Sequence, residues 1–171
     1  MRWRGIAVLV VACVVSQCGG DVESTLAMVK PDCVETNQVE SIKALVNASG
    51  FLIITERMLR LEESLARNFY AEHSKREFFD DLVDFMTSGS VAAMVLQKHN
   101  AIAEWRELIG PTDPSKARVS HPQTLRAKWG IDTQRNCVHG SDSSLSAGRE
   151  ISLLFGGSRS TGAGRISHEE L

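Results

Sequence analysis

Residues 136–143 read Asn136-Cys137-Val138-His139-Gly140-Ser141-Asp142-Ser143 and set one histidine among small polar residues. Asp142 or Ser143 can cap a helix that starts there, so the histidine would lie between a short strand and the final helix. Basic residues lie far from this stretch in sequence, at Lys30, Arg106, Arg126 and Arg135. A histidine near cationic groups suits a nucleophile that accepts a phosphoryl group, because phosphoryl transfer depends mainly on positioning and charge stabilisation.

The rest of the chain alternates between strand and helix patterns. Apolar and β-branched runs predict strands over 25–29, 51–55, 91–96 and 136–138. Apolar residues at helical spacing predict helices at 37–50, 62–72, 78–86, 100–110, 124–128 and 142–155, with residues 110–123 as a loop. This order belongs to the α/β (α+β) class and suits a ferredoxin-like βαββαβ plan, a four-stranded antiparallel sheet covered by helices.

Several helix ends carry recognisable signals. Asn37 with Glu40 forms a candidate capping pair, and Asn100 is a candidate cap for the helix that follows it. Gly50 and Gly110 stand where the corresponding helices are predicted to stop.

Length and charge limit the architecture to an ordinary globule. A chain of 171 residues supports one domain with a substantial core, predicted here to span residues 22–156. The formal net charge of −2 argues against bulk nucleic-acid binding, so no specific nucleic-acid partner is expected.

The first twenty residues differ in composition from the predicted domain. Arg2 and Arg4 precede an apolar run over 6–15 and small residues over 16–20, which predicts a leader over residues 1–20. A secretory signal fits this pattern; a mitochondrial presequence, or an upstream start with no targeting role in a cytoplasmic protein, are the alternatives. Residues 157–171 are predicted to form a flexible Gly/Ser-rich tail.

The cysteines show no metal-binding spacing. They stand at positions 13, 18, 33 and 137, and only Cys33 and Cys137 belong to the predicted domain. We expect these two to be inert packed thiols, because a disulfide requires a geometry that a sequence does not reveal. No protein metal site is predicted.

The pattern N-x-x-H-G-S-D-S over 136–143 resembles the active-site signature of the nucleoside diphosphate kinases. The similarity continues along residues 25–155: L-A-M-V-K-P-D over 26–32 resembles the family's first strand and turn, 69–83 its nucleotide-gripping helical hairpin and 88–95 its central strand. The pattern W-R-x-L-x-G-P-T over 105–112 is most similar to the divergent second branch of the family, close to nucleoside diphosphate kinase 6. The resemblance supports the ferredoxin-like topology.

The resemblance implies a catalytic group around His139. This residue would take the γ-phosphoryl of a nucleoside triphosphate such as ATP and pass it to a nucleoside diphosphate, in a ping-pong scheme through phosphohistidine. Glu150 matches the glutamate that holds the histidine ring, and Ser141 would support the same contact, although a helix charge and a turn serine are the ordinary alternatives. Lys30 matches a lysine that offsets charge at the γ-phosphoryl group.

The resemblance also implies how the nucleotide is held. Phe78 matches the aromatic residue that stacks on the base, with Leu82 one helical turn away, and stacking tolerates any base. The phosphates and the sugar would be held by residues that match family positions: Arg106, Arg126, Thr112, Tyr70 and Asn136. Mg²⁺ would be carried by the nucleotide phosphates, since this ion takes few protein ligands.

Some features depart from the family pattern. Arg126-Ala127-Lys128-Trp129 replaces R-G-D-F, Pro111 replaces a glutamate, and the loop over 112–126 is about three residues longer. The Gly/Ser tail replaces the segment that ties hexamers together, so a homo-oligomer is expected but a hexamer is in doubt. These departures keep a second hypothesis open, a weakly active or inactive nucleotide-binding protein that regulates a partner.

Overall fold

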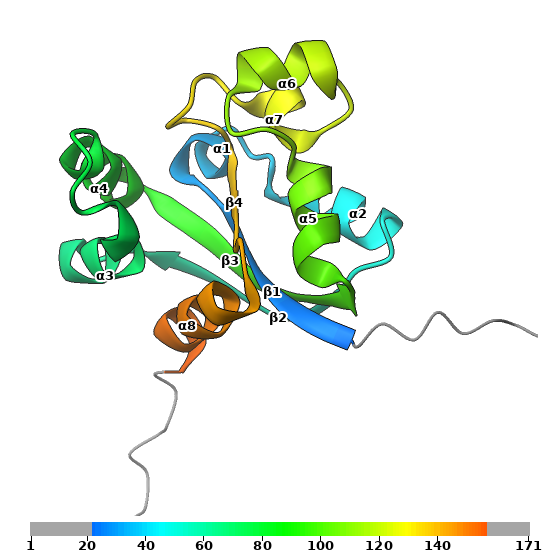
Figure 1. Cartoon of the computed structure of the whole chain (residues 1–171), viewed down its shortest axis with the longest axis horizontal. Coiled ribbons are helices and arrows are strands. Elements are labelled where there is room, and N and C mark those ends of the chain that lie inside the picture. Colours follow the sequence, from blue (N-terminus) through cyan, green and yellow to red (C-terminus); the bar gives the residue numbers. More distant parts are fainter. Residues whose placement is uncertain (1–21, 157–171) are drawn as a thin grey trace, which may run out of the picture.

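A four-stranded antiparallel sheet forms the centre of the computed structural model, which describes residues 22–156 (Figure 1). The strands are β1 (Val22–Val29), β2 (Leu52–Arg60), β3 (Ser90–His99) and β4 (Val138–Gly140), in the order β2-β3-β1-β4. The helices are α1 (Pro31–Glu35), α2 (Val39–Ala48), α3 (Glu63–Phe69), α4 (Phe79–Ser88), α5 (Ala101–Ile109), α6 (Pro114–Ser120), α7 (Leu125–Trp129) and α8 (Ser144–Phe155). This arrangement confirms the predicted fold class.

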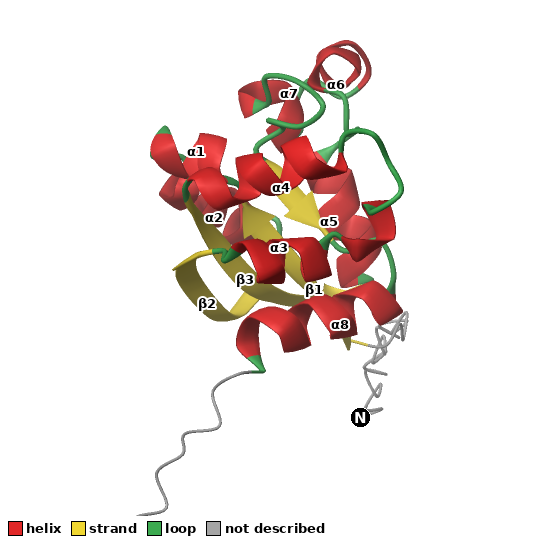
Figure 2. Cartoon of the chain, turned by 90° about the vertical axis from the view of Figure 1, so that its left-hand side faces the viewer, coloured by secondary structure: helices red, strands yellow, loops and turns green. Residues whose placement is uncertain are grey.

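Helices cover both faces of the sheet, so its central strands are buried on both sides. Along β1, Ala27 and Val29 pack into a core with α2 and α5, whereas Leu26 and Met28 pack into a second core with α3, α4 and α8. Alternate residues of a strand point to opposite faces, which explains how one strand contributes to both cores. Figures 1 and 2 show the two groups of helices on opposite sides of the sheet.

The structure differs from the sequence prediction in several local elements. The helix α6 occupies the predicted loop, because the Asp113 carboxylate accepts from the backbone N–H of Ser115 at 2.8 Å and Pro114 follows at the first helical position. The Asn37–Glu40 capping pair is wrong: the cap of α2 is Gln38, with no side-chain hydrogen bond, and Asn37 has a φ of 59°. Asn100 does precede α5, but without a side-chain capping bond.

The element around the histidine is close to its prediction. The strand β4 begins at Val138 rather than at 136, and Ser143 caps α8 through a capping box with Ser146. Gly110 ends α5 with a φ of 80°, a left-handed conformation that glycine adopts without steric penalty.

The predicted leader over 1–20 and the tail over 157–171 lie outside the described residues. Within residues 22–156, no helix has the length and apolar content needed to cross a membrane.

Candidate active site

A cavity of about 490 Å³ opens between α3, α4 and α8 on one side and the 110–137 segment on the other. Every residue predicted for the site except Ser141 lines it: Lys30, Tyr70, Phe78, Leu82, Arg106, Thr112, Arg126, Asn136, His139 and Glu150. These residues come from segments spread over positions 30–150, so the fold brings together residues that lie far apart in sequence. Arg135 does not line the cavity and instead pairs with Asp132 at 2.6 Å.

The His139 ring is held through one of its two nitrogens. Its Nε2 lies 3.0 Å from Oε2 of Glu150, and the Ser141 hydroxyl donates to the same carboxylate oxygen at 2.7 Å. Glu150 is almost buried, whereas the His139 side chain is 20% exposed. A carboxylate at Nε2 favours the tautomer that carries its proton there, which leaves the Nδ1 lone pair for a substrate.

Strand pairing sets the position of His139. It lies opposite Met28 in the antiparallel register of β1 and β4, and its ring packs edge-on against Phe69, 5.1 Å away between centroids. The indole N–H of Trp105 donates to the His139 carbonyl at 3.2 Å. Gly140 permits this contact, because a Cβ there would lie 2.5 Å from the Trp105 ring.

Ser141 is the predicted site residue that lies behind the cavity. It is buried, and its hydroxyl accepts from the backbone N–H of Leu26 at 3.2 Å while donating to Glu150. It therefore connects the carboxylate that orients His139 to the first strand of the sheet.

Two buried basic side chains, Lys30 and Arg126, line the cavity. The Lys30 ammonium donates to the Gln134 carbonyl at 3.0 Å; burial, and then the neighbouring charge of Arg126, lower its pKa to about 7. The Arg126 guanidinium donates to the carbonyls of Gly110 at 2.8 Å and Val138 at 3.1 Å. Burial, followed by the charge of Arg106, lowers the Arg126 pKa to about 10. An anionic ligand would relieve this repulsion between like charges.

Three buried polar atoms along the cavity lack hydrogen-bond partners among the described residues. They are the Tyr70 hydroxyl, Nε of Arg126 and Oδ1 of Asn136. Burial raises the pKa of Tyr70, which keeps its hydroxyl neutral. Unpartnered polar groups in a cavity are costly unless a ligand or water satisfies them, so this set fits a polar ligand.

The opposite end of the cavity is apolar. Phe78 at the start of α4 is 49% exposed, and its ring lies 5.9 Å from that of His73, whereas the next residue, Phe79, is buried in the core. Leu82 is buried on the same helix and lines the cavity below Phe78. Phe79 is thus in the core, whereas Phe78 offers a face to a flat ring.

A nucleoside diphosphate kinase sequence model matches residues 23–159 of this chain. The chain belongs to the nucleoside diphosphate kinase family. It is 50% identical over 144 residues to "Probable nucleoside diphosphate kinase 5" of Arabidopsis thaliana, covering 84% of this chain and 100% of that protein.

Solved structures of the family superpose on this fold. The Aquifex aeolicus nucleoside diphosphate kinase has a TM-score of 0.78 at 43% identity, covering 80% of this chain and 97% of its own. A nucleoside diphosphate kinase from Halobacterium salinarum in complex with CDP has a TM-score of 0.74 at 38% identity, covering 79% and 88% respectively.

This kinase-family site also contains residues that sequence reasoning did not assign. Arg149 on α8 donates to the carbonyls of Asn68 and Phe69 at 3.1 and 3.2 Å, and so joins the helix that carries Glu150 to the end of α3. In the sequence, only the position of Arg149 next to Glu150 could have indicated that it belongs to the site. Gln134 contacts Lys30 through its main chain, which no side-chain pattern could reveal.

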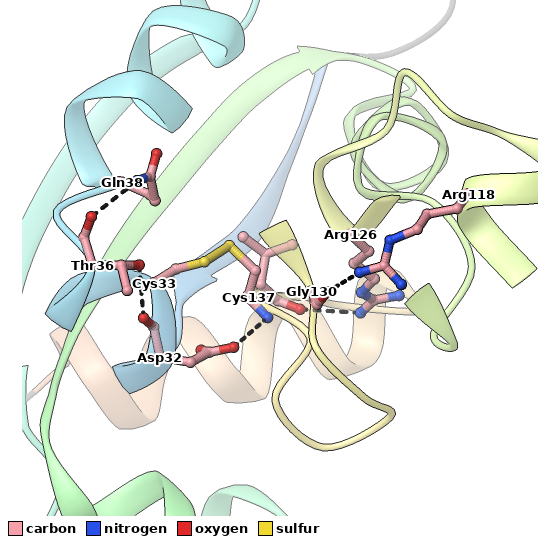
Figure 3. Close-up of a disulfide and its surroundings, with 9 residues drawn as sticks. Asp32, Cys33, Thr36, Gln38, Arg118, Arg126, Gly130 and Cys137 are labelled. Atoms are coloured by element: carbon pink, nitrogen blue, oxygen red, sulfur yellow. Dashed lines mark hydrogen bonds between the residues drawn. A yellow bond between two sulfur atoms is a disulfide. The ribbon is translucent and has the colours of Figure 1, made fainter. Parts of the chain in front are cut away.

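The structure corrects the expectation of free cysteines. Cys33 and Cys137 form a disulfide, with their Cα atoms 5.1 Å apart and a sequence separation of 104 (Figure 3). The sequence could not show this pairing because it depends on how α1 packs beside the residue that precedes β4.

The site has no cluster of metal ligands of its own. Across residues 22–156, no group of three or more His, Cys, Asp or Glu side chains could hold a metal ion. The cavity supplies cations and hydrogen-bond donors, which fit phosphate oxygens. A magnesium ion held by the phosphates themselves therefore stays a prediction.

Proposed function

We propose that this protein is an active nucleoside diphosphate kinase whose nucleophile is Nδ1 of His139. The observation that carries the proposal is the contact between Nε2 and the buried Glu150 carboxylate, supported by Ser141, in a cavity lined by Lys30 and Arg126. The contact would keep the free lone pair on Nδ1, and the cations would face the phosphates.

The reaction takes place in two matched steps. In the first, Nδ1 forms a bond to the γ-phosphorus of a nucleoside triphosphate, while the bond to the bridging oxygen breaks and the diphosphate leaves. In the second, a terminal oxygen of another nucleoside diphosphate forms a bond to this phosphorus, while the bond between Nδ1 and phosphorus breaks. Glu150 would offset the positive charge that the ring acquires, and bound Mg²⁺ would add charge neutralisation at the phosphates.

The remaining cavity residues would position the nucleotide. Arg106, Arg126 and Thr112 are proposed to contact the β- and γ-phosphates. Stacking on Phe78 would accept any base, so several nucleotides should serve as substrates. The unpaired Oδ1 of Asn136 could accept from a sugar hydroxyl, and the Tyr70 hydroxyl lies free to meet a phosphate oxygen.

The experiment uses purified protein with γ-labelled ATP and magnesium. We expect an acid-labile, alkali-stable label that added GDP discharges as labelled GTP. His139→Ala should keep its fold, measured by circular dichroism, and lose the label by a factor of at least about a thousand. Full labelling of His139→Ala would reject this nucleophile.

A weakly active regulatory protein of the same fold is the second candidate. The observation that favours it is the 110–137 wall, where α6 lies in the segment that departs from the family pattern and the sequence Ala127-Lys128 follows Arg126. On this alternative the purified protein would bind ADP without forming the phosphohistidine.

Self-association is a further part of the proposal. The edge strand β2 exposes Leu52, Ile54 and Met58, each more than half exposed. An uncovered apolar edge supports a homo-oligomer. Light scattering after gel filtration should give a mass above that of one chain, and Ile54→Lys should reduce it.

We also propose export through the secretory pathway. The leader pattern is consistent with a disulfide in the domain, because disulfides persist mainly in oxidising compartments. A carboxy-terminal fluorescent fusion would test this, with mitochondrial or cytoplasmic signal as the contrary outcomes.

A further inference from the structure

The Cys33–Cys137 disulfide joins the two segments that carry the cationic and nucleophilic groups of the site. Cys33 lies on α1, three residues after Lys30, and Cys137 lies two residues before His139 (Figure 3). Neither cysteine lines the cavity, and both are buried, at 2% and 0% exposure. The disulfide therefore lies behind the wall that faces the nucleotide.

Two hydrogen bonds connect the same segments. The backbone N–H of Lys30 donates to the Cys137 carbonyl at 2.8 Å, and the backbone N–H of Cys137 donates to the Asp32 carboxylate at 2.9 Å. Cys137 itself has a φ of 73°, a left-handed conformation that residues other than glycine seldom adopt. The disulfide and the Asp32 contact together hold this unfavourable backbone in place.

The residues beside Cys137 form a wall of the cavity. Asn136 donates to the carbonyls of Thr112 and Thr133, both at 3.0 Å, while Lys30 donates to Gln134. Opening the disulfide would leave only hydrogen bonds and core packing to hold Cys137 in its left-handed conformation. The wall would then sample arrangements in which Lys30 and Asn136 no longer face the nucleotide together.

We propose that this disulfide is a redox-sensitive support of the nucleotide site, and that its reduction by a dithiol weakens nucleotide binding. In the reduction, a thiolate of the dithiol attacks one cysteine sulfur and the other cysteine leaves as thiolate. The second thiol then closes the dithiol into a cyclic disulfide. Two electrons pass to the protein, which gains two thiols. The proposal rests on the proposed nucleotide site but not on phosphohistidine formation.

Thermodynamic reciprocity gives the inference a second consequence. If the disulfide raises the affinity for a nucleotide by some factor, the bound nucleotide must stabilise the disulfide against reduction by the same factor. This second effect can be measured on the unaltered chain.

The first experiment measures the Kd of MgADP by calorimetry for oxidised and dithiothreitol-reduced protein, with the thiol state checked by alkylation and mass. We expect reduction to raise the Kd by about fivefold or more. The double variant Cys33→Ala, Cys137→Ala should bind like the reduced protein and should not respond to dithiothreitol. Equal Kd values for the two redox states, including no binding in either, would overturn the proposal.

The second experiment titrates the disulfide in a buffer of reduced and oxidised dithiothreitol, with and without MgADP. The nucleotide should shift the equilibrium toward the disulfide by the factor found in the calorimetry. Circular dichroism of the reduced protein separates a local effect on the nucleotide site from a global effect on folding. If the reduced chain is unfolded, the disulfide is needed for the whole fold and the proposal is overturned.

Labelling of the oxidised protein with γ-labelled ATP distinguishes this proposal from the proposed function. Redox-dependent ADP binding without a label would leave the redox support standing and reject the kinase activity. If the oxidised and reduced proteins form the label at the same rate and bind ADP with the same affinity, the kinase activity would stand and the redox support would be rejected.

Discussion

The two walls of the cavity are held in different ways. The wall that carries His139 is built from regular structure: β4 pairs with β1, and a capping box starts α8, which brings Glu150 to the ring. The wall over 110–137 contains the short helices α6 and α7, and single long-range contacts, such as Arg126 to Val138 and the disulfide, join it to the rest of the domain. His139 therefore has redundant support, whereas the 110–137 wall depends on a few separate bonds.

Removing the disulfide should cause the largest loss of stability, and this loss should be located in the second wall. The bridged cysteines are 104 positions apart in sequence, and a disulfide typically contributes about 2–4 kcal/mol. We expect Cys33→Ala, Cys137→Ala to lower the free energy of unfolding in urea by that amount. Dithiothreitol should give a similar loss in the unaltered protein, and none in the double variant.

Hydrogen exchange would locate the loss. If the walls differ as described, amides of 130–137 should exchange faster after reduction than those of β4. Uniform acceleration over both walls would contradict the comparison.

Glu150→Gln tests the first wall. A glutamine cannot offset the ring charge, so phosphoryl transfer should slow by about 10- to 100-fold, by analogy with the loss of groups that orient metal-bound histidines. The Kd of MgADP should change little, because Glu150 contacts His139 and Ser141 rather than a phosphate site. Ser141→Ala is the matched control and should slow transfer less, since the carboxylate remains.

What the sequence could predict follows the same division. The short strand at His139 and the cap at Ser143 belong to local patterns, so the sequence could predict them, whereas the contact of Glu150 with His139 was expected from the family resemblance. The helix α6 was missed because a segment rich in Pro and Ser is typical of loops, and only the Asp113 contact reveals a cap. The disulfide and the main-chain contacts of Lys30 depend on tertiary packing, which has no local sequence signal.

Lys30 donates to the Gln134 carbonyl of the second wall, and its lowered pKa gives a pH dependence that tests this side of the cavity. Burial and Arg126 bring this pKa from 10.5 to about 7. In the free protein, burial of Lys30 therefore opposes folding increasingly as the pH falls from 10.5, and this cost is complete below about 7. Phosphates bind the ammonium form, so affinity for MgADP should fall by up to about tenfold per pH unit above 7.

Lys30→Met is the control for that pH dependence. It should bind MgADP weakly, without the fall between pH 7 and 9, and should raise the free energy of unfolding of the free protein at pH 7. An unchanged slope in Lys30→Met would assign the titration to another group.

The smallest effect is expected from the cap of α6. The Asp113 carboxylate accepts from the backbone N–H groups of Ser115 at 2.8 Å and Lys116 at 3.4 Å, and α6 has only seven residues. Loss of such a cap costs about 1 kcal/mol, so Asp113→Ala should lower the free energy of unfolding by that amount and loosen α6. Asp113→Asn keeps a capping oxygen and should lose much less. Because α6 packs on α7, which carries Arg126, MgADP affinity should weaken with Asp113→Ala while the labelling rate at saturating ATP stays the same. A slower rate at saturation would show that the two walls are coupled rather than separately supported.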